Sequence, residues 1–411
     1  MNKKKNLSIF ACFVLLVCSA ADTDANIDSL PSAGEVQEQM MAGWAMRPGG
    51  GSGAQNIADV PGEIVTSSAV NTAAALQEDP ENAVFISMSN TENRVEIEEA
   101  GTYVISGSAS DGSITVKKGT TGVVLVLKDL DLTSEKGAPL SINKMAEVKV
   151  VISGTVTLTD AEDPADENAV TAEIADAYDG AALKIKANAM VFITGDGTLN
   201  LVGKAKNGIK GGDEASMILD GPVVQIAAVN DGINLNFDLT ILSGTLAVSA
   251  GDDALHADHI LTIGKEDGSG PVIYIAQCSE GLEAAVVNIF GGDLTVNAVD
   301  DAVNAADKDE LYQGQLTPSI NMTGGSVTIN GQGDGFDSNG NINLIAGSAV
   351  INTQNRGGEA GIDYDGAYYI SADFRMENTG GVSGPDAMGR GFGQGGPGGG
   401  FGQNGRGWPR P

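Results

Sequence analysis

The chain is short of cysteine, of cations and of histidine, and each shortage argues against a class of protein. Among 411 residues there are three cysteines, and only Cys278 lies beyond residue 21, so a disulfide-stapled framework is excluded. Lys and Arg total 23 against 54 Asp and Glu, and the net charge of −31 argues against a nucleic-acid partner. His256 and His259 are the two histidines, too few to favour a Ser-His-Asp catalytic site.

Aromatic residues are also scarce, at 5% of the chain. Trp44 and Trp408 both fall in flanking segments of low complexity, so tyrosines must supply any flat aromatic surface of a binding site. Tyr364 and Tyr368 are the candidate aromatic contacts with substrate. The scarcity argues against a neutral ligand that binds by stacking on aromatic rings.

The N-terminal apolar run, Leu7–Val17, is too short to span a bilayer. Three lysines precede it and small residues follow it, so residues 1–21 are predicted to be a signal peptide. Leu15-Leu16-Val17-Cys18 resembles a bacterial lipoprotein box with Cys18 as the lipidated residue, although Val17 replaces the small residue usual there. We therefore expect a secreted or outer-surface protein, either free or anchored to a membrane by lipid.

Composition divides the remaining chain into three parts. Residues 22–60 are polar and Gly-rich and are predicted to be a disordered linker, and residues 381–411 form a Gly-rich disordered tail. Residues 61–380 carry short β-branched runs separated by Gly-Gly or Ser-Gly turns. They predict strands over 122–127, 147–152, 191–193, 240–242, 246–248, 260–263, 286–289 and 326–329.

One acidic phrase recurs in the C-terminal half: a carboxylate, a small residue, an apolar residue and a polar residue of a type that binds metals. Its carboxylates are 22, 27, 21 and 33 residues apart, in the segments Asn230–Asn234, Asp252–His256, Ser279–Glu283, Asp300–Asn304 and Gly333–Asp337. Periods of this size indicate a solenoid with one coil per period. A β-sandwich would show turns every 8–12 residues or so without a phrase in register. We predict an all-β solenoid in a single elongated domain.

Stacked coils would place these acids in two columns. The first would hold Asp231, Asp253, Glu280, Asp301 and Asp334, and the second Asn234, His256, Glu283, Asn304 and Asp337; Asp252 and Asp300 adjoin the first, and Asp363 and Asp365 belong to a later coil. Two carboxylates about 5 Å apart repel by roughly 3 kcal/mol at an effective dielectric near 20. Ca²⁺ would relieve that repulsion, since it binds carboxylate and amide oxygens. The columns predict a Ca²⁺ site; for any one Asp, ordinary turn formation is the alternative. His256 is expected to be a solvated turn residue.

Several phrases resemble a family of bacterial secreted carbohydrate-binding proteins with a right-handed parallel β-helix. They are Asn207–Lys210, Asn230–Ile233, Asp334–Gly340, Gly361–Gly366, the upstream Ala100–Gly107 and the Gly-rich end, so that the likeness covers about residues 95–400. The resemblance implies a pectate-lyase-like helix that binds Ca²⁺ and acidic polysaccharide without a demonstrated lyase reaction. An acidic plant or microbial glycan of the pectin or polygalacturonate type is thus the expected partner of a monomeric protein.

Three alternatives stay open. Asp252-Asp253 and Asp300-Asp301 offer the paired carboxylates of a hydrolase, but the Gly-His-Gly and Arg-Ile-Lys stretches of such enzymes do not occur. A lyase needs a base beside a Ca²⁺-bound uronate, and Arg356 is the candidate base as well as the candidate contact for a substrate carboxylate. A surface adhesin that binds no sugar is the third. We expect a binding protein without catalytic residues.

Overall fold

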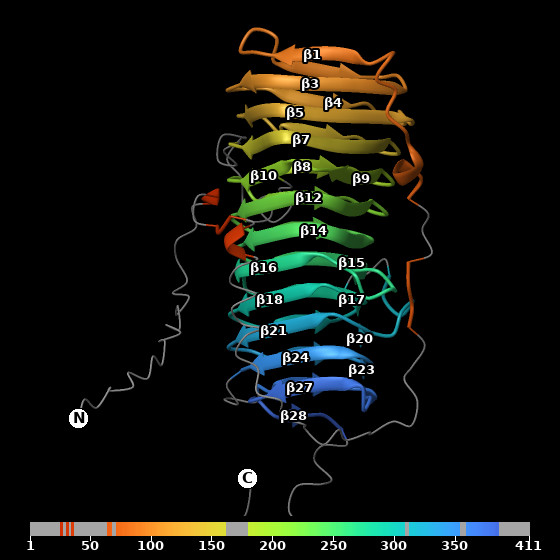
Figure 1. The fold of residues 1–411 in the computed structure, drawn as a ribbon, viewed down its shortest axis with the longest axis vertical. Coiled ribbons are helices and arrows are strands. Elements are labelled where there is room, and N and C mark those ends of the chain that lie inside the picture. The colour runs from red at the N-terminus through yellow and green to blue at the C-terminus, as the bar shows by residue number, and fades with distance from the viewer. Residues whose placement is uncertain are drawn as a thin grey trace, which may run out of the picture.

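The chain forms a tall stack of β-strands in the computed structural model (Figure 1). The structure describes residues 25–27, 30–32, 34–36, 64–67, 71–161, 180–308, 312–353 and 359–385. The described strands form one 28-stranded sheet, and helix in the described ranges is limited to single turns such as η2 (Thr72–Ala75). The all-β expectation is confirmed. Cys18 and Arg356 lie outside the described residues.

Strand pairing is parallel throughout the described ranges and follows three series. The first series, in order, is β1 (Val84–Met88), β3 (Gly101–Ala109), β5 (Val123–Ser134), β7 (Glu147–Asp160), β10 (Thr198–Gly203), β12 (Ser216–Ala228), β14 (Leu239–Ser249), β16 (Val272–Gln277), β18 (Asp293–Ala298), β21 (Ser326–Gly331), β24 (Gly347–Asn352) and β27 (Phe374–Asn378).

The second series is β2 (Arg94–Ile97), β4 (Ser113–Val116), β6 (Leu140–Ile142), β8 (Ala181–Ile185), β11 (Asn207–Gly211), β13 (Ile233–Leu235), β15 (Leu255–Ile263), β17 (Leu282–Ile289), β19 (Val303–Ala305), β22 (Phe336–Ser338), β25 (Ile362–Tyr364) and β28 (Val382–Ser383). The third series joins segments of the longer strands to β9 (Met190–Gly195), β20 (Ser319–Met322), β23 (Asn341–Leu344) and β26 (Tyr368–Ile370). Each member pairs with the members one repeat earlier and one repeat later.

Strand β18 shows why these residues stack. Its side chains alternate between part-exposed and buried, with Leu294 and Val296 pointing into the core. Leu294 lies in register with Ile273 before it and Val327 after it, so apolar side chains form a continuous column. Full burial of each such side chain contributes about 1.5–3 kcal/mol. Repetition of this pattern, coil after coil, builds the core.

Strand β14 differs from the sequence prediction of two strands joined by a Ser243-Gly244 turn. It runs unbroken from Leu239 to Ser249, and Gly244 adopts φ +103 within it. A Cβ atom on Gly244 would lie 2.4 Å from the Pro222 carbonyl oxygen. The backbones of successive coils therefore touch at this bend, which only glycine allows. The predicted turn is a bend inside one strand.

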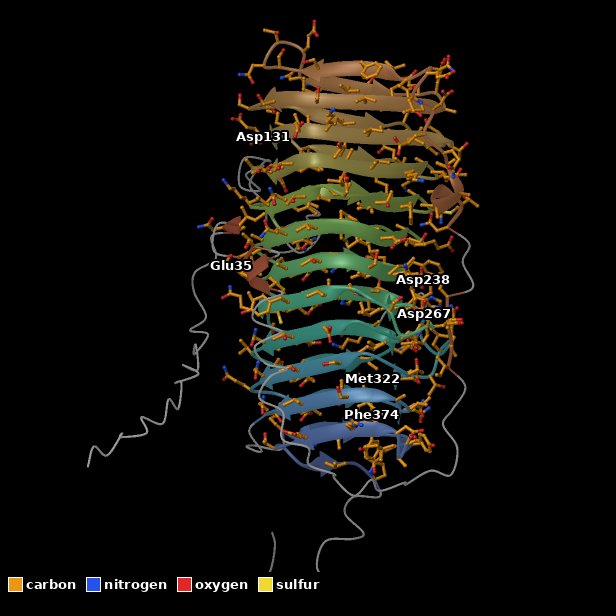
Figure 2. The ribbon with its side chains drawn as sticks, in the orientation of Figure 1. Glu35, Asp131, Asp238, Asp267, Met322 and Phe374 are labelled. Carbon is orange, nitrogen blue, oxygen red and sulfur yellow. The ribbon has the colours of Figure 1, made fainter. Side chains whose placement is uncertain are left out.

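Two N-terminal segments lie against the stack far from their place in the sequence. Leu30 and Val36 are buried, Gln225 Nε2 donates a hydrogen bond to the Pro31 carbonyl at 3.1 Å, and Figure 2 shows Glu35 beside the middle coils. Further down the stack, Asn288 Nδ2 donates to the Val65 carbonyl at 2.9 Å. The prediction of a disordered linker over 22–60 is wrong for the described part of 25–36, because its apolar side chains are buried there. No helix in the described ranges is long and apolar enough to cross a membrane.

Candidate functional site

The second predicted column is in register. Strand pairing places its members one above another in the order Asn234, His256, Glu283, Asn304, Asp337 and Asp363. Lys210 and Lys184 extend the same column toward the N-terminal end. The column therefore changes from cationic to acidic along the stack. Sequence reading missed its cationic part because neither lysine belongs to an acidic phrase. We call the acidic part, together with the first column, the acidic ladder.

The first column makes hydrogen bonds between coils. Asp231 Oδ1 accepts from the Asp253 backbone N–H at 3.2 Å, and Asp301 Oδ1 accepts from the Asp334 N–H at 2.8 Å. Asp334 Oδ1 accepts from the Ala360 N–H in the same way. These bonds join residues 22 to 33 positions apart in the sequence, so they differ from the local turn hydrogen bonds that were the alternative for each Asp. Because an ionised carboxylate has two oxygens and about four lone-pair sites, the bonds leave room for a second partner.

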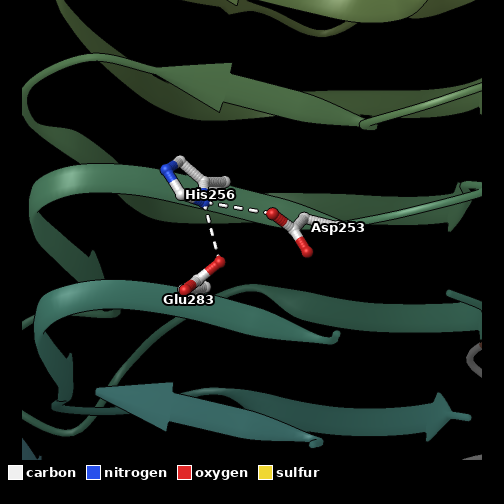
Figure 3. Close-up of side chains that lie close together, drawn as sticks. All are labelled: Asp253, His256 and Glu283. Carbon is white, nitrogen blue, oxygen red and sulfur yellow. Dashed lines mark hydrogen bonds and ion pairs between the residues drawn. The ribbon is translucent and has the colours of Figure 1, made fainter. Parts of the chain in front are cut away.

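The N-terminal half of the ladder carries its own cations. His256 Nδ1 lies 3.1 Å from Asp253 Oδ2 and 3.0 Å from Glu283 Oε2, as Figure 3 shows, and His256 Nε2 lies 2.7 Å from Asp258 Oδ1. Lys308 forms ion pairs with Glu283 and, at 3.8 Å, with Glu280. His256 is thus a largely buried ion-pair partner, and the expectation of a solvated turn residue is wrong.

Protonation in this half follows from the same contacts. Burial lowers the pKa of His256, but hydrogen bonds to Asp253, Asp258 and Glu283 outweigh burial and raise that pKa well above its usual value. Burial raises the pKa of Glu283, yet His256 and Lys308 bring it down to about 2. Glu283 is therefore ionised beside an imidazolium and an ammonium. Burial, with the charges of Glu283 and Asp231, still raises the pKa of Asp253 to about 7, so the two cations compensate this half in part.

The C-terminal half of the ladder gathers carboxylates around Asp334. Carboxylate oxygens of Asp301, Asp334 and Glu359 all lie within 4.8 Å of one another, and those of Asp334, Asp337 and Asp363 do the same. Asp334 is shared by the two groups and is buried. Within the described ranges, no Lys, Arg or His side chain pairs with these five acids. Their mutual repulsion is therefore not relieved by the described part of the chain.

Burial and that repulsion together raise the pKa of three of these carboxyls. Burial, followed by the charges of neighbouring acids, raises the pKa of Asp301 to about 6. The same two causes raise the pKa of Asp334 and of Asp337 to about 7. Shifts of this kind concentrate at functional sites, where a bound cation would favour the ionised form.

Donor chemistry in this half fits a hard cation. All five acids offer oxygen, and Asn304, whose strand position lies next to that of Asp337, has a buried amide oxygen without a hydrogen-bond partner in the described structure. Buried amide oxygens normally have partners. Ca²⁺ accepts six to eight oxygens from carboxylates, amides, backbone and water in flexible geometry, whereas softer metals favour thiolate or imidazole. The residues present therefore suit Ca²⁺.

Comparison with known proteins assigns the chain to a family. Residues 91–357 match a family described as "Carbohydrate-binding domain-containing protein". The chain belongs to this family. The matched stretch includes the ladder from Asp231 through Asp337, and Asp363 lies just beyond it.

One relative within this carbohydrate-binding-domain family comes from Acetivibrio thermocellus and bears the same description. It is 30% identical over 188 residues, which cover 45% of this chain and 56% of the relative, so the match spans about half of that relative's length. A solved structure, titled a polysaccharide lyase-like protein from C. thermocellum (gadolinium derivative), aligns with 74% of this chain and 99% of its own at 21% identity. Its TM-score is 0.37, too low to assign a shared geometry.

Several predicted site residues lie elsewhere than expected in this family member. Tyr364 and Tyr368 are 1% and 3% exposed, with ring centroids 5.4 Å apart in the core, so they cannot present a face to a sugar. Their prediction as substrate contacts is wrong because their strand positions point inward. Asn234 Oδ1 accepts from Lys210 Nζ at 2.7 Å and its Nδ2 donates to Asp231 at 2.6 Å, which removes this amide from the metal ligands.

The other predicted acids flank the site, and two functional residues were not predicted. Asp252, Asp300 and Asp365 are exposed beside the ladder and belong to none of the close groups. Glu359 and Lys308 were missed because neither falls in the repeated phrase. Glu359 comes before the last acidic coil, and Lys308 comes after β19. A cation placed four residues after the phrase that ends at Asn304 is the signal that could have found Lys308.

Proposed function

We propose that this protein binds an acidic polysaccharide through Ca²⁺ held by the C-terminal half of the acidic ladder. The family description supports a carbohydrate partner. The observation that carries the proposal is the convergence of Asp301, Asp334, Asp337, Asp363 and Glu359 into two groups that share Asp334. Five carboxylates with no described counter-ion call for a dication, and their oxygen ligands select Ca²⁺.

We infer that the strands wind as a right-handed parallel β-helix. Three parallel series with one strand from each per repeat support this winding. Right-handed connection is the general rule for parallel strands in one sheet. In such a helix the ladder is a straight row along one corner, and an extended polymer is the ligand shape that can follow it.

The negative charge of the protein is the reason to expect both an acidic glycan and a calcium ion that bridges it to the ladder. A chain of net charge −31 repels a polyuronate, and the exposed Asp252, Asp300 and Asp365 lie on the approach to the ladder. A Ca²⁺ ion that is ligated by the ladder on one side can take uronate carboxylates on the other. Binding should therefore require calcium, and a neutral glycan would gain little from it.

The test compares Asp337→Asn combined with Asp363→Asn against the control Asp131→Asn. Asp337 accepts no backbone hydrogen bond in the described structure, so its removal spares the turns, while Asp131 is exposed near the N-terminal end of the stack (Figure 2). Calorimetry should show Ca²⁺ affinity at least about tenfold weaker in the double variant, a loss of about 1.4 kcal/mol. The control should match the unmutated protein.

Polygalacturonate binding in calcium and in chelator completes this experiment. We expect binding in calcium only, and weakened in the double variant. Binding that survives chelation would contradict the calcium bridge. Absorbance from an unsaturated uronate product would show that the protein is a lyase, which contradicts a binding protein without catalytic residues.

We further propose that the protein is exported and that lipid on Cys18 anchors it. The support is the sequence pattern of residues 1–21 alone. Cys18→Ala should move the protein from the membrane fraction into the medium, as followed by fractionation and immunoblotting. Identical fractionation of the two proteins would sink the lipid anchor.

A further inference from the structure

A second polar feature lies at the opposite end of the strands that lead into the ladder. An open groove of about 710 Å³ runs across the starts of β18, β21, β24 and β27 and under the loop 264–270. Its polar lining consists of Ser269, Asp293, Ser326, Ser348, Asp373 and Arg375. We call it the glycine groove, because Gly292, Gly325 and Gly347 line it as well.

The floor of the groove is bare because the coils touch there. Gly292, Gly325 and Gly347 have φ values of +101, +76 and +107. A Cβ atom on any of them would lie within 2.7 Å of backbone in the preceding coil. Side chains are therefore excluded at this corner, and the hollow is a fixed consequence of stacking. The wall is also ordered: Lys265 N–H donates to the Ser269 carbonyl at 2.7 Å, and Ser269 Oγ donates to Asp267 at 2.5 Å.

The lining offers one cation among hydrogen-bonding groups. Asp293, Ser326, Ser348 and Arg375 succeed one another in strand register down the groove. Arg375 is exposed, and no carboxylate of the described residues forms an ion pair with it. Lys265 and Lys308, by contrast, are paired with acids. A guanidinium in an open hollow can take a carboxylate with two parallel hydrogen bonds.

We infer that the glycine groove is a glycan subsite in which Arg375 binds a uronate carboxylate directly, without calcium. Asp293 and Asp373 accept hydrogen bonds from sugar hydroxyls. The inference rests on the proposed function, whose ligand it shares, and adds a second contact on the same polymer. At about 4.8 Å per coil, the five coils that line the groove extend about 19 Å, room for a short oligosaccharide.

The groove and the ladder border the same strands. Asp293 opens β18 and Asp301 follows it; Ser326 opens β21 and Asp334 follows it. Each of these two strands is six residues long, so at about 3.3 Å per residue its two ends lie roughly 20 Å apart, with the groove at one end and the ladder at the other. A polymer long enough to reach both gains effective concentration at the second site once it is bound at the first.

The test compares Arg375→Gln with Arg94→Gln, a similarly exposed arginine near the N-terminal end of the stack. Two quantities are measured: Ca²⁺ affinity without glycan, and oligogalacturonate affinity in calcium and in chelator. We expect Arg375→Gln to weaken oligogalacturonate about tenfold and to leave Ca²⁺ affinity unchanged, while Arg94→Gln changes neither. In the unmutated protein, saturating oligogalacturonate should slow amide hydrogen exchange over 291–296 and 373–378.

The outcomes separate the two proposals. Unchanged oligogalacturonate affinity in Arg375→Gln, with no slowed exchange in either segment, overturns the groove. Binding that persists in chelator and is lost in Arg375→Gln supports the groove and overturns the calcium bridge. An unmutated protein that binds no oligogalacturonate overturns both.

Discussion

At the scale of single residues, the two halves of the ladder differ in the source of their counter-charge. His256 and Lys308 supply it to Asp253, Glu280 and Glu283, whereas no described side chain supplies it around Asp334. The same acidic phrase therefore serves two purposes. In one half it is part of a buried ion-pair network that holds coils together; in the other it is a candidate cation site.

Removal of the imidazolium tests the first of these purposes. His256→Gln leaves Asp253, Asp258 and Glu283 without their shared cation, so we expect the free energy of unfolding at pH 7 to fall by about 3 kcal/mol. Adding Asp253→Asn should restore part of the loss, because it removes one of the uncompensated charges. Urea denaturation of the three proteins measures both effects. A loss below about 1 kcal/mol, or no recovery in the double variant, would mean that the carboxylates relax into solvent.

At the scale of elements, the repeated strands could be predicted from the sequence, but the distant segments that contact them could not. β-Branched runs and glycine turns located strands such as β17 and β21, and the spacing of the acidic phrase set the register of Asn304 against Asp337. The strand positions and the register could be predicted because the same local sequence pattern returns in every repeat.

The repeat did not predict contacts between segments that lie far apart in the sequence. Lys308 reaches Glu283 from beyond the strand that ends at Ala305, and Glu359 joins Asp301 across two coils. Leu30 and Val36 are buried although their segment is polar and Gly-rich in composition. Tyr364 points inward because alternate side chains of the three-residue strand β25 face the core. The sequence did not define which of the three positions these are. Each of these depends on one side chain meeting a distant segment, which no periodicity encodes.

At the scale of the whole molecule, proton binding links the acidic ladder to stability. Asp301, Asp334 and Asp337 have pKa values of about 6 to 7 in the folded protein, against 3.8 as the ordinary value. The folded state therefore binds more protons than the unfolded state between about pH 4 and pH 7. Stability from these groups is complete below pH 3.8 and is lost as the pH rises through 6 to 7. The raised pKa of His256 acts in the same direction, since its contribution also declines as the pH rises through that pKa.

Calcium should reverse this decline, because it binds the ionised carboxylates and only in the folded state. We expect the metal-free protein to melt at a lower temperature at pH 8 than at pH 5, and Ca²⁺ to raise the melting temperature strongly at pH 8 and little at pH 5. At one hundred times the dissociation constant, Ca²⁺ adds about 2.7 kcal/mol, or about 5 °C for a domain of this size. Calorimetry at four pH values with and without Ca²⁺ measures the effect, with the Asp337→Asn, Asp363→Asn double variant as control, in which both the decline and the rescue should shrink. Equal calcium-induced shifts of the melting temperature at pH 5 and pH 8 would show that the metal does not bind to these carboxyls. A metal-free protein that is most stable at pH 8 would show that their repulsion is neutralised by another part of the chain.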